Sequence, residues 1–378
     1  MIHAVILKVA ARCNLNCGYC YVYNHEDKGF RQRPPFIADD VFDHAMRAVA
    51  AYCDRRQGHQ MSITFHGGEP TLIGPGRFDQ LAMRAKELLG ERLKGLSMQT
   101  NASLINKAWL TVLCRHRVQV GVSLDGPQAI HDMHRVDHLG RGSYEHTVAG
   151  LAKLQQAGLD PGLLCVVNPA SSGLDVYRHF RSLGLPRMDF LLPDATHDSR
   201  ARLYGHLGPT PVADYLIPIF DEWFDEDDPG IRIRLFTDLL RLLMGGLPDS
   251  DAFGSTPMSY VVVETDGSIE ALDALRVCED GIARSGLNVR SSNFDDLSVG
   301  RPLVYHALHE GFPLCDTCRR CPERETCGGG YLPHRFARAN GFDNPSVWCA
   351  DILALLTHIR ARLDQAARES RTAMAVCG

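Results

Sequence analysis

The sequence lacks the features that mark membrane proteins, secreted proteins and nucleic-acid-binding proteins. No apolar run reaches the ~18 residues that a membrane-spanning helix needs. The formal net charge is −5 and there is no long run of one sign, so the chain offers no basic field for nucleic acid. The segment MIHAVILKVAARC has neither the basic start nor the cleavage site of a signal peptide. These absences predict a cytoplasmic protein that binds neither membranes nor nucleic acid.

Cysteine, in contrast, is abundant, with 13 residues in a chain of 378. Disulfide scaffolds are short and have small cores, whereas this chain is 45% hydrophobic and long enough for two domains or one elaborated barrel. Clustered cysteines in a chain of this kind indicate metal binding. Oxygen-sensitive metal clusters would also need a reducing compartment.

Strand-like and helix-like segments alternate through the first half of the chain. The predicted strands are 4–9, 61–65, 96–100, 118–124, 162–167 and 188–192, and the predicted helices are 39–56, 77–89, 106–115, 143–156 and 174–183. This alternation predicts a parallel sheet. Because six such units are fewer than a closed barrel needs, we expect an α/β fold, a partial (β/α)6 barrel of TIM type followed by a smaller cysteine-rich domain. Chemistry in such barrels lies at the C-terminal ends of the strands.

The second half has a different character. Prolines, among them Pro211 and Pro218, and an acidic stretch interrupt residues 201–257, which we expect to form a bridge with one helix at 235–244. The segment SYVVVETDGSIEAL predicts a hairpin that turns at Asp266–Gly267. The expected limits are a barrel at 1–200, the bridge, a cysteine-rich domain at 258–365 ending in an amphipathic helix, and a fraying tail at 366–378.

The loop ARCNLNCGYCYVYN follows the first predicted strand and carries Cys13, Cys17 and Cys20. Three thiolates are one fewer than a [4Fe–4S] cluster normally has, so one iron keeps open sites for a small molecule. A zinc knuckle or a chance cluster is the alternative. With Tyr19 just before the last cysteine, the loop resembles the signature of radical S-adenosylmethionine (SAM) enzymes. The resemblance implies that SAM chelates the open iron and is cleaved by an electron from the cluster to a 5′-deoxyadenosyl radical.

The second predicted strand ends in FHGGEP, with Gly67, Gly68, Glu69 and Pro70. Two glycines let the backbone approach a ligand closely, and a carboxylate can bind a cationic amine. In radical SAM enzymes this motif holds the amino group of SAM, so the resemblance implies the same role here. A tight turn before a helix is the alternative.

Polar residues end the third and fourth predicted strands. Asn101 lies in QTNAS and Ser123 in SLDGP, and Arg135 follows about a dozen residues later. The resemblance implies that Ser123 and Arg135 contact polar groups of SAM, and Asn101 is a weaker candidate. A hydroxyl suits a ribose or carboxylate, and a guanidinium binds a carboxylate through charge-assisted bonds. Each residue could instead be part of a structural turn.

A second group of cysteines lies near the C-terminal end of the chain. The predicted ligands are Cys318, Cys321, Cys327 and Cys349. Their spacing resembles an auxiliary [4Fe–4S] site of the SPASM domain of peptide-modifying radical SAM enzymes. Tyr331 and Leu272 stand where the full pattern carries further cysteines, so the resemblance implies a reduced SPASM domain with one auxiliary cluster. A four-cysteine zinc site is the alternative, and Cys315 could replace a ligand or remain free.

Two segments narrow the resemblance. CYVYNHEDKGFRQRP and CGGGYLPHRFARANGFDNPSVWCADIL resemble the FxsB-type maturases, which install cyclophane crosslinks in ribosomally made peptides. The implied reaction abstracts hydrogen from a β-carbon of a precursor peptide and joins that carbon to an aromatic ring. The implied partners are the precursor peptide and an external electron donor of the flavodoxin or ferredoxin type. Polar residues such as Asp189, Glu264, Asp266 and His334 do not identify a catalytic base.

Two other functions remain open. One is another SPASM-type modification, such as formylglycine formation by a sulfatase maturase, thioether formation or epimerisation. The missing cysteines count against the sulfatase maturase. The other is a non-catalytic iron–sulfur or zinc scaffold or sensor, which would not need the GGEP motif or Arg135. We expect no winged-helix leader-binding domain before the first strand, so that the bridge, the hairpin or a separate protein would bind the precursor.

Overall fold

The computed structural model describes residues 1–298 and 306–377, which form two compact units. Unit 1 comprises Met1–Val166, Arg187–Asp189 and Thr256–Pro313; unit 2 comprises Val167–Pro186, Phe190–Ser255 and Leu314–Gly378. Residues 299–305 of the predicted cysteine-rich domain and Gly378 of the predicted tail lie outside the described residues. The expected domain limits at 200, 257 and 365 stay a prediction, because the units are interleaved along the chain.

Unit 1 is built on one mostly parallel sheet with the strand order β10-β9-β8-β1-β2-β3-β4-β5. Strands β1 to β5 each pair in parallel with the next. Their bounds are β1 Ala4–Ala10, β2 Met61–Gly67, β3 Leu93–Thr100, β4 Gln119–Ser123 and β5 Gly162–Val166, and β6 (Arg187–Leu191), where the two units meet in sequence, follows β5. These six strands match the six predicted from the sequence, and the predicted α/β fold is confirmed.

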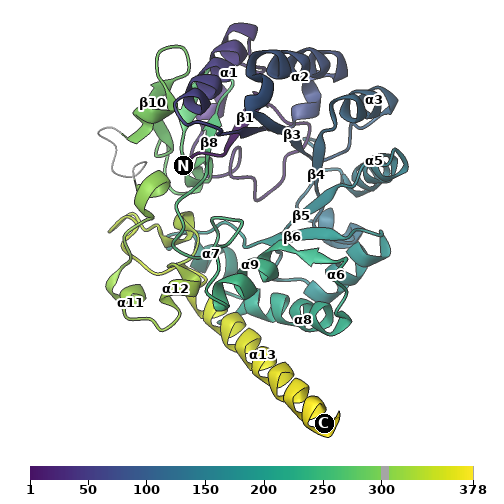
Figure 1. Ribbon diagram of the computed structural model, residues 1–378, viewed down its shortest axis with the longest axis vertical. Helices are drawn as coiled ribbons and strands as arrows, with labels where there is room; N and C mark the ends of the chain where they lie inside the picture. The colour runs from purple at the N-terminus through teal and green to yellow at the C-terminus, as the bar shows by residue number, and fades with distance from the viewer. Residues whose placement is uncertain (299–305, 378) are drawn as a thin grey trace. The chain divides into compact units, whose positions relative to one another are not determined.

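Helices connect the parallel strands and cover one face of the sheet in unit 1 (Figure 1). They are α1 Asp39–Asp54, α2 Pro75–Leu89, α3 Lys107–His116, the short α4 Gln128–His131 and α5 Tyr144–Gln156. The core between helices and sheet is aromatic: the ring centroid of Phe78 in α2 lies 4.7 Å from that of Phe65 in β2 and 5.4 Å from that of Trp109 in α3. Alternate strand residues therefore bury one face of the sheet under the helices, as the period of a strand requires.

The opposite face of strands β2 to β4 is small and polar. Along β2, Met61, Ile63 and Phe65 are buried, whereas Ser62, Thr64 and His66 are half-buried. Thr64 Oγ1 lies 2.8 Å from Ser97 Oγ in β3. A closed barrel fills this face with bulky branched residues, so the small polar side chains here leave it open to solvent or a ligand.

The predicted hairpin is present, and it extends the sheet. Strands β8 (Tyr260–Val263) and β9 (Ser268–Glu270) are antiparallel and turn at Asp266–Gly267, where Gly267 has a φ of +86°. Strand β8 pairs in parallel with β1, and β10 (Arg284–Asn288) pairs with β9. The hairpin thus lies directly beside the strand that leads into the Cys13–Cys20 loop.

Unit 2 is mostly helical. Its elements are α6 Gly173–Ser182, α7 Arg200–Tyr204, α8 Pro211–Glu226, β7 Arg232–Ile233, α9 Arg234–Leu243, α11 Asp316–Arg319, α12 Arg324–Cys327 and α13 Cys349–Cys377. Helices α6 and α9 match the predictions. The segment that was expected to fray continues as helix up to Cys377.

Helix α8 differs from the prediction, which placed proline breaks in this segment. Pro211 occupies the first turn, where a missing N–H costs little, and Pro218 lies inside the helix. Asp351 of α13 accepts hydrogen bonds from Val212 N (2.7 Å) and Ala213 N (3.1 Å), so α13 caps α8. This cap and the buried apolar face of α8 compensate for the internal proline.

Within the described ranges, no helix is long and apolar enough to span a lipid bilayer.

Candidate active site

The loop that carries Cys13, Cys17 and Cys20 begins directly after β1 and turns back through backbone hydrogen bonds. Cys20 N donates to Cys17 O at 3.0 Å, and Leu15 N donates to Cys13 Sγ at 3.3 Å. Hydrogen bonds from the backbone N–H groups of Val22 and Tyr23 lower the pKa of the Cys20 thiol. N–H groups that face thiolate sulfurs are a feature of iron–sulfur sites, because they stabilise the negative charge on the sulfurs.

The electrostatics of the three thiols also suit a metal cluster. Burial raises the pKa of each thiol, that of Cys20 to about 11, and Glu69 raises the pKa of Cys13 further. A bound cation would supply the positive charge that these thiolates need. In residues 1–298 and 306–377, no group of three or more His, Cys, Asp or Glu side chains is arranged to hold a metal ion. The fit to a [4Fe–4S] cluster therefore rests on the donor chemistry of the loop.

The end of β2 lies along this cysteine loop. Gly68 N donates to Ala10 O at 2.8 Å, and Glu69 N donates to Arg12 O at 2.9 Å. A Cβ atom at Gly67 would lie 2.1 Å from Ala10 O, and one at Gly68 would lie 2.3 Å from Arg12 O. The two glycines of the predicted SAM motif are thus required by close approach to the cysteine loop.

Glu69 is buried and anchored by four hydrogen bonds. Its Oε1 accepts from Thr71 N (3.0 Å), Thr71 Oγ1 (2.5 Å) and Thr100 Oγ1 (2.6 Å), and its Oε2 accepts from Asn101 N (2.8 Å). Burial raises the pKa of this carboxyl, and these donors counteract the rise. Oε2 keeps capacity for one more donor, which suits the predicted contact with an amine. Pro70 begins the short 3-10 helix Pro70–Ile73 that Glu69 caps.

Asn101 and Ser123 take supporting positions in the structure. The Asn101 side chain donates to Asn14 Oδ1 in the cysteine loop at 2.9 Å, so it links that loop to Glu69. Ser123 Oγ, at the end of β4, accepts a hydrogen bond from Gln99 Nε2 at 2.9 Å. Their contacts with SAM stay a prediction, since both have protein partners here.

Tyr19 and Arg135 meet at an aspartate that the sequence analysis did not single out. The Tyr19 hydroxyl donates to Asp125 Oδ2, and Arg135 Nη1 donates to the Tyr19 hydroxyl at 2.6 Å. Burial raises the pKa of Asp125, whereas Arg135 and Tyr19 lower it. Arg135 is 8% exposed, and its Nε has no hydrogen-bond partner among the described residues. This buried donor fits the predicted role of Arg135 in binding an anionic group.

The segment after α4 covers the outer side of the cysteine loop. Asn16 N donates to Val136 O at 2.7 Å, and Gly18 N donates to His134 O at 3.0 Å. His138 Nε2 lies 2.9 Å from Cys13 O. The segment that carries Arg135 is thereby held against the loop that carries Cys17.

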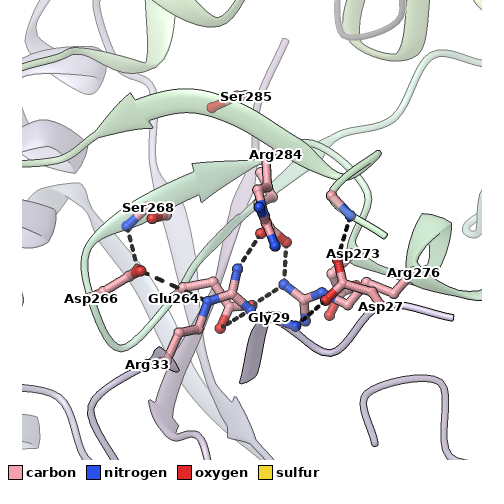
Figure 2. Close-up of polar contacts among 12 residues, drawn as sticks. Asp27, Gly29, Arg33, Glu264, Asp266, Ser268, Asp273, Arg276, Arg284 and Ser285 are labelled. Carbon is pink, nitrogen blue, oxygen red and sulfur yellow. Dashed lines mark hydrogen bonds and ion pairs between the residues drawn. The ribbon is translucent and has the colours of Figure 1, made fainter. Parts of the chain in front are cut away.

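A buried network of charges connects β1 to the hairpin, and Figure 2 shows its members Arg33, Glu264 and Arg276. Its members are Lys8, Arg33, Glu264, Glu270, Asp273 and Arg276. Lys8 Nζ contacts Asp273 and lies 3.3 Å from Glu264. Arg33 lies 3.2 Å from Glu264 and 2.7 Å from Glu270, and Arg276 lies 2.7 and 2.5 Å from the same two carboxylates. Three cations thus balance three carboxylates.

This charge network reaches the cysteine loop through Tyr21, whose hydroxyl donates to Asp273 Oδ2 at 2.9 Å. Burial raises the pKa of Glu264, but the nearby cations of Lys8, Arg276 and Arg33 outweigh burial and lower this pKa to about 2. Lys8 likewise lowers the pKa of Asp273. The sequence offered one signal of the network, since Lys8 is a charge inside the apolar strand AVILKVA.

The second cysteine group lies within unit 2 and contains five interacting thiols. The pKa of Cys318 is raised to about 12, mainly by burial and further by Cys315, Cys327 and Cys349. Burial also raises the pKa of Cys349, and Cys321 adds to that rise. The pKa values of Cys318 and Cys349 thus depend on other predicted ligands and on Cys315, which hydrogen-bonds Cys318.

Two further features of this group suit a metal cluster. Hydrogen bonds from the backbone N–H groups of Gly329 and Gly330 lower the pKa of the Cys327 thiol, which burial raises. Arg335, which is 2% exposed, interacts with Cys318, Cys315 and Cys327. As in the Cys13–Cys20 loop, backbone N–H groups counteract the rise in the pKa of a cysteine thiol.

Residues 7–170 match the family model described as Radical SAM superfamily. This range includes the Cys13–Cys20 loop, the Gly67–Pro70 motif, Asn101, Ser123 and Arg135.

Curated relatives match over most of the chain. A cysteine-type anaerobic sulfatase-maturating enzyme of Clostridium perfringens is 27% identical over 336 residues, which cover 86% of this chain and 87% of that protein. A serine-type anaerobic sulfatase-maturating enzyme of Bacteroides thetaiotaomicron is 25% identical over 382 residues, with coverage of 96% and 90%.

Solved structures agree in fold. The anaerobic sulfatase-maturating enzyme anSMEcpe with bound AdoMet superposes with a TM-score of 0.83 at 23% identity, over 97% of this chain and 99% of that one. Streptococcus suis SuiB bound to its precursor peptide SuiA has a TM-score of 0.61 at 15% identity, over 92% and 76%. Residues 7–170 of the chain are thus similar to the radical SAM superfamily, and relatives along most of its length include anaerobic sulfatase-maturating enzymes.

Proposed function

We propose that this chain is a radical SAM enzyme that modifies a peptide. In this proposal Cys13, Cys17 and Cys20 hold a [4Fe–4S] cluster, and Glu69 and Arg135 bind the amino and carboxylate groups of SAM. The observation that carries the proposal is the juxtaposition of three half-buried thiols with backbone N–H donors and a buried carboxylate that retains acceptor capacity. When bound, the cluster and SAM supply the means to abstract a hydrogen atom from an unactivated carbon.

The protein's own residues bind and orient the reactants. The four hydrogen bonds to Glu69 fix its carboxylate at the end of β2, next to the cysteine loop. Tyr19 and Asp125 fix the Arg135 guanidinium on the other side of that loop. The half-buried polar face of β2 to β4 offers a place for the substrate, because strand ends and the open side of a partial barrel adjoin there.

We propose a ribosomally made precursor peptide as the substrate, with a new bond between a β-carbon and an aromatic ring as the product. The resemblance of residues 20–34 and 327–353 to FxsB-type maturases supports this cyclophane reaction. That solved structures of similar fold contain peptides, such as Cp18Cys with anSMEcpe and SuiA with SuiB, supports a peptide substrate.

Of the two hydrogens that the peptide would lose in this reaction, one leaves as a hydrogen atom, and the other leaves the ring as one proton and one electron. We propose that an auxiliary [4Fe–4S] cluster at Cys318, Cys321, Cys327 and Cys349 accepts an electron, and that a flavodoxin or ferredoxin reduces the first cluster. The five neighbouring thiols and Arg335 support a cluster at this position. The oxygen sensitivity of such clusters fits the reducing cytoplasm.

The second candidate function is the oxidation of a serine or cysteine to formylglycine. The sulfatase-maturating enzymes that match most of the chain favour it. Against it stand Leu272 and Tyr331 at positions where we expect cysteines of a further cluster.

Co-expression with candidate precursor peptides distinguishes the two functions. Crosslinking removes two hydrogens and blocks fragmentation between two residues in tandem mass spectrometry, and the product does not react with a hydroxylamine probe. Formylglycine reacts with that probe as an aldehyde. An aldehyde, or deuterium gained from heavy water without mass loss, would exclude the cyclophane proposal. A peptide left unchanged by active enzyme that cleaves SAM would mean that the precursor is wrong.

A further inference from the structure

The hydroxyl group of Tyr23 is buried and has no hydrogen-bond partner among the described residues. A buried hydroxyl without a partner destabilises the folded protein, so such a group in a native protein calls for an explanation such as a bound ligand or cofactor. Tyr23 follows the last cysteine of the loop by three residues, and its backbone N–H donates to Cys20 O at 3.2 Å.

Gly68 and the aromatic ring of Phe30 fix the position of the Tyr23 hydroxyl. A Cβ atom at Gly68 would lie 1.9 Å from Tyr23 Oη, so only the missing side chain of Gly68 makes room for the hydroxyl. The Tyr23 ring packs edge-on against Phe30, with centroids 4.8 Å apart and planes at 90°. The hydroxyl is thus held between the end of β2 and the cysteine loop.

The groups that face Tyr23 are the predicted cluster ligands. Burial raises the pKa of Tyr23, and the next largest effects come from Cys13 and then Cys20, ahead of Arg12 and Glu264. A phenol is protonated at neutral pH even with its ordinary pKa. The Tyr23 hydroxyl is therefore an unused O–H donor that lies next to Gly68, where β2 approaches the loop of Cys13 and Cys20.

We propose that Tyr23 donates its O–H to a sulfur atom of the cluster held by Cys13, Cys17 and Cys20, and so raises the reduction potential of that cluster. This inference rests on the proposed iron–sulfur site and does not depend on the peptide reaction. A hydrogen bond to a cluster sulfur stabilises the more negative, reduced cluster more than the oxidised one. Tyr23 acts here through the cluster, as a positioning residue that tunes a potential.

The neighbouring Tyr21 provides a matched control. It lies in the same loop and is half-buried, like Tyr23, but its hydroxyl donates to Asp273 Oδ2 at 2.9 Å. Tyr21→Phe therefore removes the same atom from the same loop, and Tyr23→Phe alone removes the proposed bond to the cluster.

The test is a redox titration monitored by electron paramagnetic resonance on anaerobically prepared full-length protein, without SAM or peptide. We expect Tyr23→Phe to lower the ratio of reduced to oxidised cluster at a fixed potential about tenfold, the equivalent of one charge-assisted hydrogen bond and a shift of about 59 mV to more negative potential. Tyr21→Phe should shift the potential much less. An unchanged potential in Tyr23→Phe, or equal shifts in both variants, would overturn the inference.

A second variant covers the case in which Tyr23→Phe fails to assemble the cluster. Incorporation of 3-fluorotyrosine at position 23 keeps the packing and makes the hydroxyl a stronger donor, so the potential should move to more positive values. No shift, or a negative one, would contradict the inference. Iron analysis distinguishes failure of the Tyr23 inference from failure of the proposed function. Protein that never binds iron at the Cys13–Cys20 loop would refute the proposed cluster site, whereas iron-loaded protein with an unchanged potential would refute only the role of Tyr23.

Discussion

The charge network beside the cysteine loop makes a quantitative prediction for Lys8→Met. The substitution keeps the length and apolar part of the side chain but removes the ammonium that lies between Glu264 and Asp273, whose side chains are 2% and 9% exposed. Loss of one partner from a buried ion pair costs about 3–5 kcal/mol. Glu264 keeps Arg33 and Arg276, so we expect the lower end of this range, about 3 kcal/mol.

Hydrogen exchange measured by mass spectrometry reports this loss where it occurs. Peptides that cover β8 and β9 should exchange on the order of 100-fold faster in Lys8→Met, because each 1.4 kcal/mol is a factor of ten. Peptides from α8 in unit 2 serve as the internal reference. Adding Asp273→Asn to Lys8→Met should restore part of the protection, since it removes the uncompensated charge.

The effect of Lys8→Met on stability should depend on pH in a defined direction. In the wild type the pKa values of Asp273 and Glu264 are lowered, the latter to about 2, so their stabilisation is present above the ordinary carboxyl pKa and is lost only as pH falls through the lowered values. Without Lys8 the pKa of Asp273 rises. The loss of stability in Lys8→Met relative to the wild type should therefore be largest at neutral pH and shrink towards pH 5. Equal hydrogen-exchange rates of the β8 and β9 peptides in wild type and Lys8→Met at pH 7 would refute the reasoning. So would a loss of stability in Lys8→Met that grows on acidification.

Three further predictions concern the proposed cofactor sites. Glu69→Gln should weaken SAM binding in equilibrium dialysis at least about tenfold, because SAM loses a charged partner. Thr71→Val, which removes one hydrogen-bond donor to the same carboxylate, should retain SAM binding. Equal losses of affinity in the two variants would assign Glu69 a structural role only. Cys318→Ala should reduce iron from about eight to about four per chain, and Cys315→Ala should leave about eight; the reverse pattern would make Cys315 the ligand. Asp125→Asn should destabilise the protein by about 1–2 kcal/mol in thermal melts, because the Tyr19 hydroxyl loses a charged acceptor, and an unchanged melt would contradict that contact.

The sequence predicted the strands and the first cysteine loop because both depend on local patterns. Strand-like segments that alternate with helix-like segments predicted β1 to β6, and the cysteine loop directly follows β1 along the chain. The same reasoning failed for α8, because the burial of its apolar face and the cap from Asp351 outweigh the local preference of Pro218. Tertiary packing of this kind leaves no local signal.

The site was predicted only where residues belong to motifs. Glu69 and Arg135 were found, but their partners were not, since Asp125 meets Tyr19 and Arg135 only in the folded chain. The charge network joins Lys8 to Asp273 across most of the chain, and one lysine in an apolar strand does not reveal its partner. Tyr23 was missed for the same reason, because its significance depends on Gly68 and on the absence of a partner.

The most direct test of the account is the formation of 5′-deoxyadenosine. Anaerobically reconstituted wild-type protein, given a strong reductant, SAM and its peptide, should release 5′-deoxyadenosine in liquid chromatography with mass detection, and Cys17→Ala should release none. Failure of the iron-loaded wild type to cleave SAM under these conditions, or zinc in place of iron at Cys13, Cys17 and Cys20, would contradict the account.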